Sequence, residues 1–341
     1  MMGPALVRHE PVGVSAGIVP WNVPLFISML KLAPALASGS TMVLKPAPET
    51  PLSAYALAEL CADAGVPDGV VNIVPAGRET GQHLVTHPDV DKVSFTGSTA
   101  AGRKIGAACG ELLRRVTLEL GGKSAAIVCD DADLDAIMPE LIASSTMNNG
   151  QACVAQTRIL ATRSRYDEVV EALTEAVAAI PVGDPADMET GCGPLIAERQ
   201  RDRVEGYLQI GRDEGARITT GGGRPDGQDS GWFVEPTVFA DVDNSMRIAQ
   251  EEIFGPVLAV IPVDDTDDAI RVANDSDYGL SGTVWTGDVE AGLDIARKVR
   301  TGTYTVNGFA MEWGAPFGGF KDSGVGRELG PEGLAAYLES K

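Results

Sequence analysis

The sequence predicts an α/β protein built from two doubly wound domains, in which parallel strands alternate with helices. A chain of 341 residues is longer than one ordinary core accommodates, although a single large α/β unit with an appendage would also fit. Short, almost continuous apolar segments alternate with amphipathic ones. Hydrophobic residues make up 44% and charged residues 22% of the chain, which is typical of a soluble globular protein.

The first alternation begins near residue 41 and ends at residue 120. Its strands are mainly apolar, and its helices have apolar residues on one side. Because buried parallel strands need helices on both faces, the pattern predicts a nucleotide-binding type of domain over residues 18–121. In chain order, the predicted strands are 41–46, 69–75, 92–97 and 115–120, and the predicted helices are 50–65, 79–87 and 98–110.

A second alternation follows the glycine pair Gly121 and Gly122, where we place a domain boundary. It continues to about residue 310 and predicts a second α/β domain. Glycine pairs also form plain turns, so the boundary depends on the change of pattern around it. The predicted strands include 124–129 and 157–164, and the predicted helices include 133–149 and 166–180.

Charge and cysteine usage exclude several classes of function. A net charge of −21 and a pI near 4.5 would repel nucleic acid and anionic membranes, and no stretch of 18 apolar residues occurs. The five cysteines are odd in number and lack a C-x-x-C pair, so we expect neither a disulfide framework nor a metal site. With no apolar leader at the N-terminus, the simplest location is the cytoplasm.

Cys153 lies in the segment NNGQACVA, directly after a predicted helix. Most free cysteines are buried and serve only in packing, which is one interpretation of Cys153. The other is a nucleophile, which needs a base nearby. The histidines His9, His83 and His87 all precede the thiol. His83 and His87 are four residues apart, but Leu84 occupies the place of the glutamate in an H-E-x-x-H site.

Glu119 is a better candidate base than any histidine. It ends an apolar strand in VTLELGGKS, where burial would raise the pKa of its carboxyl towards neutrality. The pattern fits equally well an acid at the rim of the strand that faces solvent. The segment FTGSTAAG predicts a capped helix start with affinity for an anion such as a cofactor phosphate, although an ordinary strand-to-helix turn looks the same.

Eight segments together resemble the aldehyde dehydrogenase superfamily. They follow the family's order and cover nearly the whole chain. The resemblance implies an aldehyde dehydrogenase-like α/β fold and a homodimer or homotetramer. The segments are IVPWNVP (18–24), LKPAPETP (44–51), FTGSTAAG (95–102), LELGGKS (118–124), GQAC (150–153), EEIFGPV (251–257), VN (306–307) and PFGGFKDSGVGRE (316–328).

The resemblance implies a catalytic role for four residues. Cys153 corresponds to the nucleophile that attacks an aldehyde carbon, forming a thiohemiacetal and then, after hydride transfer, a thioester. Glu119 corresponds to the base that activates water to hydrolyse the thioester. Asn22 corresponds to a donor of the oxyanion hole, together with the backbone N–H of Cys153. Lys31 corresponds to a helical lysine near the proton path of the base, although a solvated helix face is the alternative for it.

The resemblance also implies NAD as cofactor, with NADP left open. Pro48 stands where many members that prefer NAD carry a glutamate that binds the ribose. Trp21 is expected near the adenosine, although plain packing is the alternative for it. The other expected cofactor residues are Lys45 at the adenosine ribose, Gly97, Ser98 and Gly102 in the pyrophosphate segment, Glu252 at the nicotinamide ribose and Phe254 beside the ring.

The resemblance divides the chain into four parts. Residues 1–17 are expected to be a remnant of an interdomain or oligomerisation strand, and residues 18–121 an incomplete NAD(P)-binding domain. Residues 122–322 are the expected catalytic domain, and residues 323–341 a C-terminal segment. Family members usually carry further residues before HEPVGV and a last strand after LESK, so we expect an incomplete scaffold.

The leading hypothesis is oxidation of an aldehyde to a carboxylic acid, and two alternatives stay open. One is a truncated, non-catalytic remnant that acts as a subunit or binding module. The other is transfer of the acyl group to coenzyme A, against which Glu119 argues because that branch commonly lacks a hydrolytic base. The sequence does not name the aldehyde, but a hydrophobic one is expected from the apolar residues in the tunnel segments, namely Val23, Phe26, Phe309, Met311 and Trp313.

Overall fold

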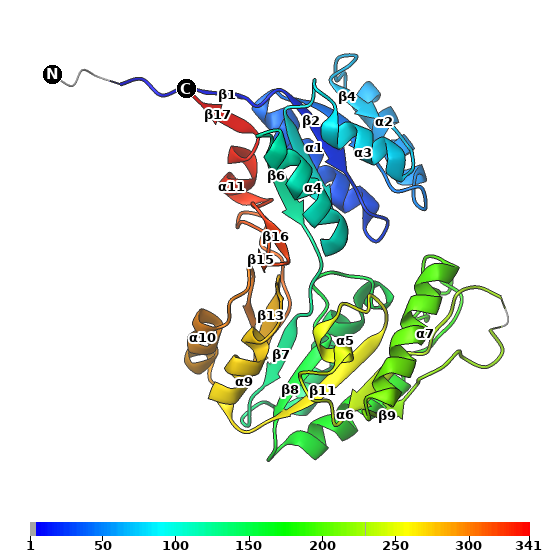
Figure 1. Ribbon diagram of the computed structural model, residues 1–341. Coiled ribbons are helices and arrows are strands. Elements are labelled where there is room, and N and C mark those ends of the chain that lie inside the picture. The colour runs from blue at the N-terminus through cyan, green and yellow to red at the C-terminus, as the bar shows by residue number, and fades with distance from the viewer. Residues whose placement is uncertain (1–4, 229) are drawn as a thin grey trace. The chain divides into compact units, whose positions relative to one another are not determined.

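The computed structural model describes residues 5–228 and 230–341, which form two compact units (Figure 1). The first unit contains the chain up to Leu120, together with residues 312–319 and 323–341. The second unit contains Gly121–Met311 and Phe320–Asp322. Within the described residues, no helix has the length and apolar character needed to cross a membrane.

The first unit is built on a six-stranded sheet in the order β16-β6-β5-β2-β3-β4. All neighbouring strands are parallel except β16, which runs antiparallel to β6. The strands are β2 (Val14–Ile18), β3 (Thr41–Lys45), β4 (Val71–Ile73), β5 (Lys92–Thr96), β6 (Arg115–Glu119) and β16 (Gly324–Val325). The helices are α1 (Pro24–Ser38), α2 (Leu52–Asp63), α3 (Arg78–Thr86), α4 (Thr99–Glu111) and α11 (Gly330–Ala335).

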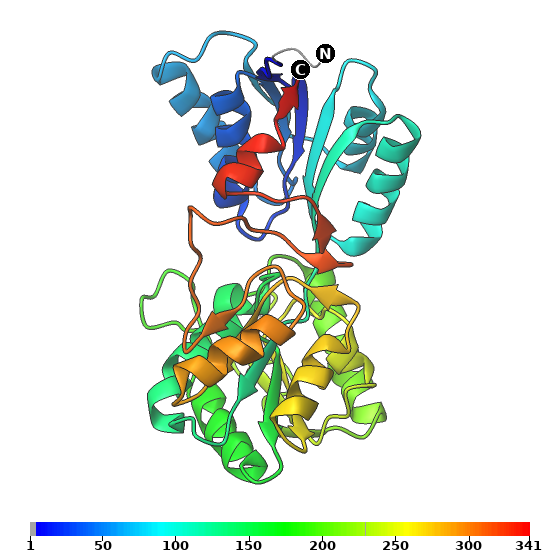
Figure 2. The same ribbon diagram turned by 90° about the vertical axis from the view of Figure 1, so that its left-hand side faces the viewer.

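Helices cover both faces of this sheet, as the apolar strands require. Helices α3 and α4 pack against a cluster that includes Ala16, Val93 and Phe95. Helices α1 and α2 pack against a second cluster that includes Met42 and Leu44. Near the two chain ends, β1 (His9–Pro11) pairs antiparallel with β17 (Leu338–Ser340) in a separate ribbon (Figure 2).

The second unit contains a seven-stranded sheet in the order β14-β13-β7-β8-β11-β10-β9, in which only β9 is antiparallel to its neighbour. A short ribbon, β12 (Tyr278–Gly279) with β15 (Phe320–Lys321), lies beside it. The strands are β7 (Ala125–Val128), β8 (Arg158–Thr162), β9 (Arg217–Thr220), β10 (Thr237–Ala240), β11 (Val257–Val263), β13 (Gly282–Trp285) and β14 (Thr305–Val306). The helices are α5 (Leu134–Thr146), α6 (Tyr166–Ala178), α7 (Glu198–Asp213), α8 (Arg247–Gln250), α9 (Thr266–Asn274) and α10 (Val289–Lys298).

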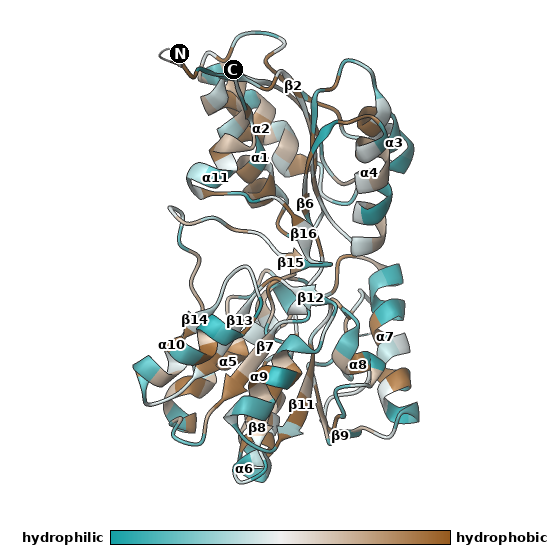
Figure 3. Ribbon diagram, turned by 60° about the vertical axis from the view of Figure 1, so that its left-hand side comes forward, coloured by the Kyte–Doolittle hydropathy of each residue, from teal (hydrophilic) through white to brown (hydrophobic). Residues whose placement is uncertain are grey.

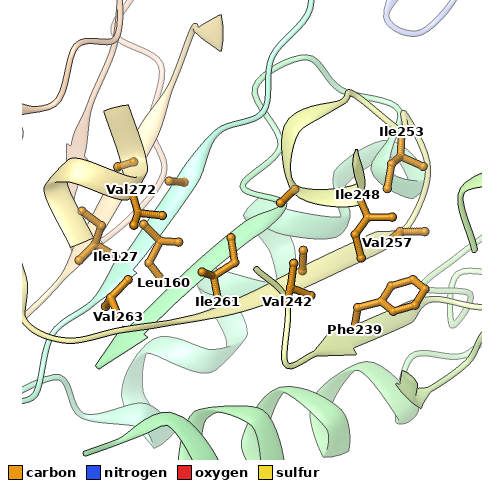
Figure 4. Close-up of a cluster of buried hydrophobic side chains, with 14 of the residues drawn as sticks. Ile127, Leu160, Phe239, Val242, Ile248, Ile253, Val257, Ile261, Val263 and Val272 are labelled. Carbon is orange, nitrogen blue, oxygen red and sulfur yellow. The ribbon is translucent and has the colours of Figure 1, made fainter. Parts of the chain in front are cut away.

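Alternate residues of the central strands of the second unit fill two apolar layers. Ile127, Leu160 and Ile261 point into one layer, where Figure 4 shows them with Phe239 and Ile248. Their chain neighbours fill the layer on the opposite face, under α5 and α6. Strands β8 and β11 are accordingly hydrophobic, while α9 and α10 carry hydrophilic residues as well (Figure 3).

Two expected domain limits need correction. Residues 14–17, assigned to an interdomain strand, belong to β2 in the middle of the first sheet, where Ala16 is completely buried. Residues 312–319, assigned to the catalytic domain, belong to the first unit. The C-terminal residues 323–341 join the same unit because β16 extends its sheet and α11 packs on α1. Residues 1–4 of the predicted 1–17 segment lie outside the described residues.

Candidate active site

The turn before Cys153 follows from its sequence. Helix α5 ends at Thr146, and Asn148, Asn149 and Gly150 then have φ values of 51°, 57° and 71°. Asparagine and glycine tolerate this left-handed region best. At Gly150 a side chain is also excluded by space, because a Cβ would lie 2.0 Å from the carbonyl oxygen of Gly255. The segment NNG therefore fixes the path of the chain into Cys153.

Two side chains that precede the thiol hold this turn. The Asn149 side chain accepts a hydrogen bond from the Gly193 N–H at 3.0 Å and donates one to the Pro194 carbonyl at 3.2 Å. Gln151 accepts a bond from the Ile196 N–H at 3.1 Å. Cys153 itself is half-buried, whereas Cys109, Cys129 and Cys192 are buried.

Three of the other cysteines are poorer nucleophiles by location. Cys109, Cys129 and Cys192 are buried, and burial raises the pKa of the Cys109 thiol above its ordinary value. Burial likewise raises the pKa of Cys129 and of Cys192 to about 11. Because the thiolate is the reactive form, the raised pKa values make these three thiols less reactive. Cys61 is half-buried on α2.

Two glycines bring Glu252 and the Cys153 turn close together within the second unit. The Gly122 N–H donates to Glu252 Oε1 at 2.9 Å, and a Cβ on Gly121 would lie 2.7 Å from Glu252 Oε2. A Cβ on Gly122 would lie 2.1 Å from the carbonyl oxygen of Cys153. Burial raises the pKa of the Glu252 carboxyl, while the Gly122 N–H lowers it.

Phe254 holds a strained backbone beside this cluster. Its φ is +64°, which is unusual for a bulky side chain and typical of functional segments. Gln200 fixes it by donating to the Phe254 carbonyl at 2.7 Å. Gly150, Glu252 and Phe254 also line one small cavity. The second unit thus gathers the predicted nucleophile and two predicted cofactor residues.

The remaining predicted residues lie at one edge of the first sheet. Trp21 and Asn22 follow β2, Lys45 ends β3, and Ser98 follows β5. Because β2, β3 and β5 are parallel, their carboxyl ends meet at the same edge, where doubly wound sheets bind ligands. Trp21 and Asn22 are half-buried in the turn that precedes α1.

Glu119, at the carboxyl end of β6, is buried rather than at a solvent-facing rim. It is 3% exposed, and neither carboxylate oxygen has a hydrogen-bond partner among the described residues. Burial raises the pKa of Glu119 well above its ordinary value, the Glu328 carboxylate raises it further, and Lys31 and Arg327 oppose the shift. At Gly318 a Cβ would lie 2.7 Å from Glu119 Oε1, so only glycine fits there.

Lys31 is fully buried, so the alternative of a solvated helix face is wrong. Its Nζ donates to Thr96 Oγ1 and to Glu328 Oε1, each at 2.7 Å. Ser94 Oγ also donates to Glu328 Oε1, at 3.2 Å. We did not predict Glu328 as a functional residue, although the segment PFGGFKDSGVGRE contains it.

A cavity of about 530 Å³ opens beside α3 and α4 of the first unit. This volume is in the range of small-molecule and cofactor sites. Lys45 lines it and is held by bonds from Nζ to the carbonyls of Pro46, at 2.9 Å, and Ala76, at 2.7 Å. Burial lowers the pKa of Lys45.

Ser98 and the first turn of α4 line this cavity. Ser98 caps the helix by accepting the Ala101 N–H at 3.4 Å. The N-terminus of a helix favours an anion such as a phosphate. Gly97 and Gly102 act through close packing, because a Cβ would lie 2.5 Å from Phe95 Cζ in one case and 2.4 Å from Leu120 Cδ2 in the other. The residues present therefore fit the adenine nucleotide half of a dinucleotide.

A second, apolar cavity of about 370 Å³ lies in the first unit between α1 and α11. The rings of Phe26 and Trp313 meet edge to face, with 5.6 Å between their centroids. Phe309 and Met311 belong to the second unit, where the Phe309 N–H donates to Glu140. Of the tunnel segments predicted from the sequence, Phe26 and Trp313 line this cavity.

Comparison with known proteins identifies the family. Residues 3–341 match the sequence model of the aldehyde dehydrogenase family. The chain belongs to this family. It is 57% identical over 336 residues to the geranial dehydrogenase of Castellaniella defragrans, covering 98% of this chain and 70% of that relative. It is 47% identical to a 3-succinoylsemialdehyde-pyridine dehydrogenase of a Pseudomonas species, covering 100% of this chain and 72% of that one.

Solved structures of aldehyde dehydrogenases share the fold. An aldehyde dehydrogenase of Mycobacterium tuberculosis in complex with NAD+ matches with a TM-score of 0.97 and 59% identity, over 98% of this chain and 69% of that one. An aldehyde dehydrogenase C variant of Pseudomonas syringae, in complex with NAD+ and octanal, matches with a TM-score of 0.96 and 44% identity, over 98% and 70%. As a member of this family, the protein is an oxidoreductase that converts aldehydes to acids with NAD(P) as cofactor.

Proposed function

We propose that this aldehyde dehydrogenase oxidises an apolar aldehyde, with Cys153 as nucleophile, Glu119 as general base and Asn22 as oxyanion donor. One observation carries the proposal. Glu119 is 3% exposed, its oxygens have no hydrogen-bond partner in the described part of the chain, and its pKa is raised. Burying a carboxylate without a partner lowers the stability of the fold, so a functional role is the better explanation for it. A raised pKa suits the carboxylate to accept a proton near neutral pH.

The first step is covalent. The Cys153 thiolate attacks the aldehyde carbon, and the carbonyl oxygen takes up the electron pair of the broken π bond. A side-chain N–H of Asn22 then stabilises this oxygen, for which such a donor is typically worth about 3 kcal/mol. When bound, NAD supplies the acceptor for the hydride that leaves the thiohemiacetal carbon. The acyl group remains on Cys153 as a thioester.

The second step is hydrolysis. Glu119 removes a proton from water while the water oxygen attacks the thioester carbon. The carbon–sulfur bond breaks, and the acid leaves with Cys153 restored as a thiolate. Glu119 then loses its proton towards the Lys31–Glu328 pair, whose charges already act on its pKa. Because the base must be ionised, hydrolysis should slow as the pH falls through the raised pKa of Glu119.

The cofactor is expected to lie along the residues already described. In this proposal Lys45 and the start of α4 at Ser98 hold the adenosine ribose and the pyrophosphate, with Trp21 near the adenosine. Gly97 and Gly102 allow the close packing of this segment. Glu252 holds the nicotinamide ribose, and Phe254 lies beside the ring.

The proposed substrate is a hydrophobic aldehyde. The apolar cavity with the Phe26–Trp313 pair supports this class, since aromatic and aliphatic side chains line it almost entirely. Two relatives support it as well, because one is named a geranial dehydrogenase and another was solved with octanal. We further propose a cytoplasmic homodimer or homotetramer, which rests on the family resemblance and on cysteine usage.

The test is NADH formation with an aldehyde panel. Octanal and geranial should give a higher kcat/KM than betaine aldehyde. Among the described lining residues no acidic side chain neutralises a quaternary ammonium group, and the Phe26–Trp313 pair offers it only a cation–π contact. Cys153→Ala should abolish NADH formation, whereas the matched Cys61→Ala should leave it unchanged. A preference for betaine aldehyde would contradict the substrate class, and turnover by Cys153→Ala would contradict the mechanism.

A further inference from the structure

Helix α7 of the second unit contacts each residue of the segment 251–255, which contains Glu252 and Phe254. The residues of α7 that make these contacts are three or four positions apart, so they share one face of the helix. They are Gln200, Arg203, Val204 and Tyr207, and we call them the α7 face. The short helix α8, which directly precedes the segment, also lies beside α7 (Figure 3).

The backbone carbonyls of the segment accept hydrogen bonds from the α7 face. Nε of Arg203 donates to the Ile253 carbonyl at 3.1 Å, and Nη2 of Arg203 donates to the Glu252 carbonyl. Nε2 of Gln200 donates to the carbonyl of Phe254 at 2.7 Å and to that of Ile253 at 3.4 Å. The consecutive carbonyls of residues 252–254 therefore all have partners on one helix.

Both ends of the segment are held as well. Tyr207 Oη donates to Glu251 Oε2 at 2.6 Å, and the guanidinium carbon of Arg203 lies 5.1 Å from the centroid of the Tyr207 ring. At the other end, Gly255 packs directly on Val204, because a Cβ at this glycine would collide with Cγ2 of Val204. The segment thus follows the α7 face along its whole length.

A backbone held in this way keeps an unfavourable conformation. Phe254 has a φ of +64°, and a bulky residue stays in this region only where the surrounding structure determines it. Gln200 bonds the carbonyls of Phe254 and of the residue before it. The Glu252 carboxylate is held separately, by the Gly122 N–H at 2.9 Å. The α7 face therefore fixes the backbone from which the Glu252 and Phe254 side chains extend.

We propose that Arg203 and Gln200 are positioning residues for the cofactor, which act through the backbone of residues 252–254 and not by contact with the cofactor. The inference rests on the proposed function, in which Glu252 holds the nicotinamide ribose and Phe254 lies beside the ring. Two N–H groups of one planar guanidinium bond two successive carbonyls, so Arg203 fixes both peptide planes that flank Ile253. A rotation of either plane would displace the Glu252 carboxylate or the Phe254 ring.

The charge of Arg203 supports the same role. Burial, the largest cause, raises the pKa of the Glu252 carboxyl, whereas the Gly122 N–H, Arg203 and Lys123 lower it. A nearby positive charge favours the ionised form of a carboxyl group. Arg203 therefore also helps to keep Glu252 ionised, the form that accepts hydrogen bonds from ribose hydroxyl groups.

The experiment measures the affinities of NAD and of AMP by fluorescence titration for wild type, Arg203→Met, Glu252→Gln and the double variant. AMP reports on the adenine nucleotide half alone. Arg203→Met should bind NAD about tenfold more weakly, as expected for the loss of one or two hydrogen bonds, and should bind AMP as wild type does. In the double variant, the loss should exceed that of Glu252→Gln by at most about twofold, because Arg203 then has no ribose contact left to position.

Gln209→Ala is the matched control, because Gln209 is an exposed residue of α7 that bonds Asp213 of the same helix. It should keep both affinities. Arg203→Lys keeps the charge but replaces the planar fork by a single ammonium, so its NAD affinity should lie between those of wild type and Arg203→Met. It takes the place of Arg203→Met in the comparison if the methionine variant does not fold.

Three results would overturn the inference. They are a wild-type NAD affinity in Arg203→Met or in Arg203→Lys, an equal loss of AMP affinity, and additive losses in the double variant, which would indicate direct contact between Arg203 and the cofactor. An unchanged NAD affinity in Glu252→Gln would instead overturn the proposed role of Glu252, and the inference with it.

Discussion

Replacing Lys31 by methionine should damage both stability and hydrolysis. The Lys31–Glu328 pair has a nitrogen–oxygen distance of 2.7 Å, with side chains 0% and 4% exposed. At that separation, an effective dielectric constant of about 20 gives an attraction of about 6 kcal/mol. The desolvation of two ions offsets much of this, but removing only one partner leaves a buried charge and typically costs about 3–5 kcal/mol. We expect a loss of that size in urea unfolding at pH 7.

The same change should move the pH profile. Lys31 lowers the pKa of Glu119, so its removal should raise that pKa and shift the acidic limb of hydrolysis to higher pH. The double variant Lys31→Met, Glu328→Gln leaves no unpaired ion and should recover most of the stability. The reasoning about this pair would be refuted by a Lys31→Met protein as stable as wild type, or by an acidic limb of the pH profile of hydrolysis at the same pH as in wild type.

Three further changes test separate parts of the account. Glu119→Gln should become more stable relative to wild type as the pH rises above about 4, because a raised folded-state pKa means that ionisation destabilises the wild-type fold; urea titrations at several pH values would reveal it. Gly102→Ala should cost about 1–3 kcal/mol and weaken NAD binding, because its Cβ would lie 2.4 Å from Leu120 Cδ2. The control Gly110→Ala, with open space on the same helix, should gain about 0.5–1 kcal/mol and keep its NAD affinity in fluorescence titration. Cys192→Ala should retain the activity of wild type in the NADH assay, since burial keeps this thiol protonated.

The alternation of strands and helices could be predicted because the central strands, such as β5, β7 and β8, are buried on both sides. The predicted strand 92–97 corresponds to β5, and the predicted strand 115–120 corresponds to β6. The start of β2 was missed for a physical reason. Its sequence VSAGI is rich in small residues, and its place between β3 and β5 depends on long-range pairing.

Long-range pairing also explains why the C-terminal segment, residues 323–341, could not be assigned to the first unit from the sequence. Strand β16 has only two residues, Gly324 and Val325, and it forms because Gly324 fits against the Leu118 carbonyl, where a Cβ would lie 2.0 Å away. Nothing local in the sequence indicates this contact. The role of Glu328 depends on the same folding back, because its partners Lys31 and Ser94 are 297 and 234 residues distant in sequence.

The burial of Glu119 and Lys31 could be predicted only in part from the sequence pattern. A carboxylate at a strand end faces either solvent or the core, and the covering residue Gly318 lies 199 residues further along the chain. The sequence of α1, PLFISMLKLAPALAS, is apolar around Lys31, but this pattern alone does not decide the burial of the lysine. In the same helix the apolar residues Leu25 and Met29 are 49% and 40% exposed.

The most direct test of the central claim is a rapid-mixing experiment on Glu119→Gln with octanal and NAD. If Cys153 forms a thioester and Glu119 hydrolyses it, one NADH per active site should appear in a burst and steady turnover should then nearly stop. Mass spectrometry of the quenched protein should find one acyl group on Cys153. Steady turnover at the wild-type rate, with no burst and no acyl group on Cys153, would contradict the account.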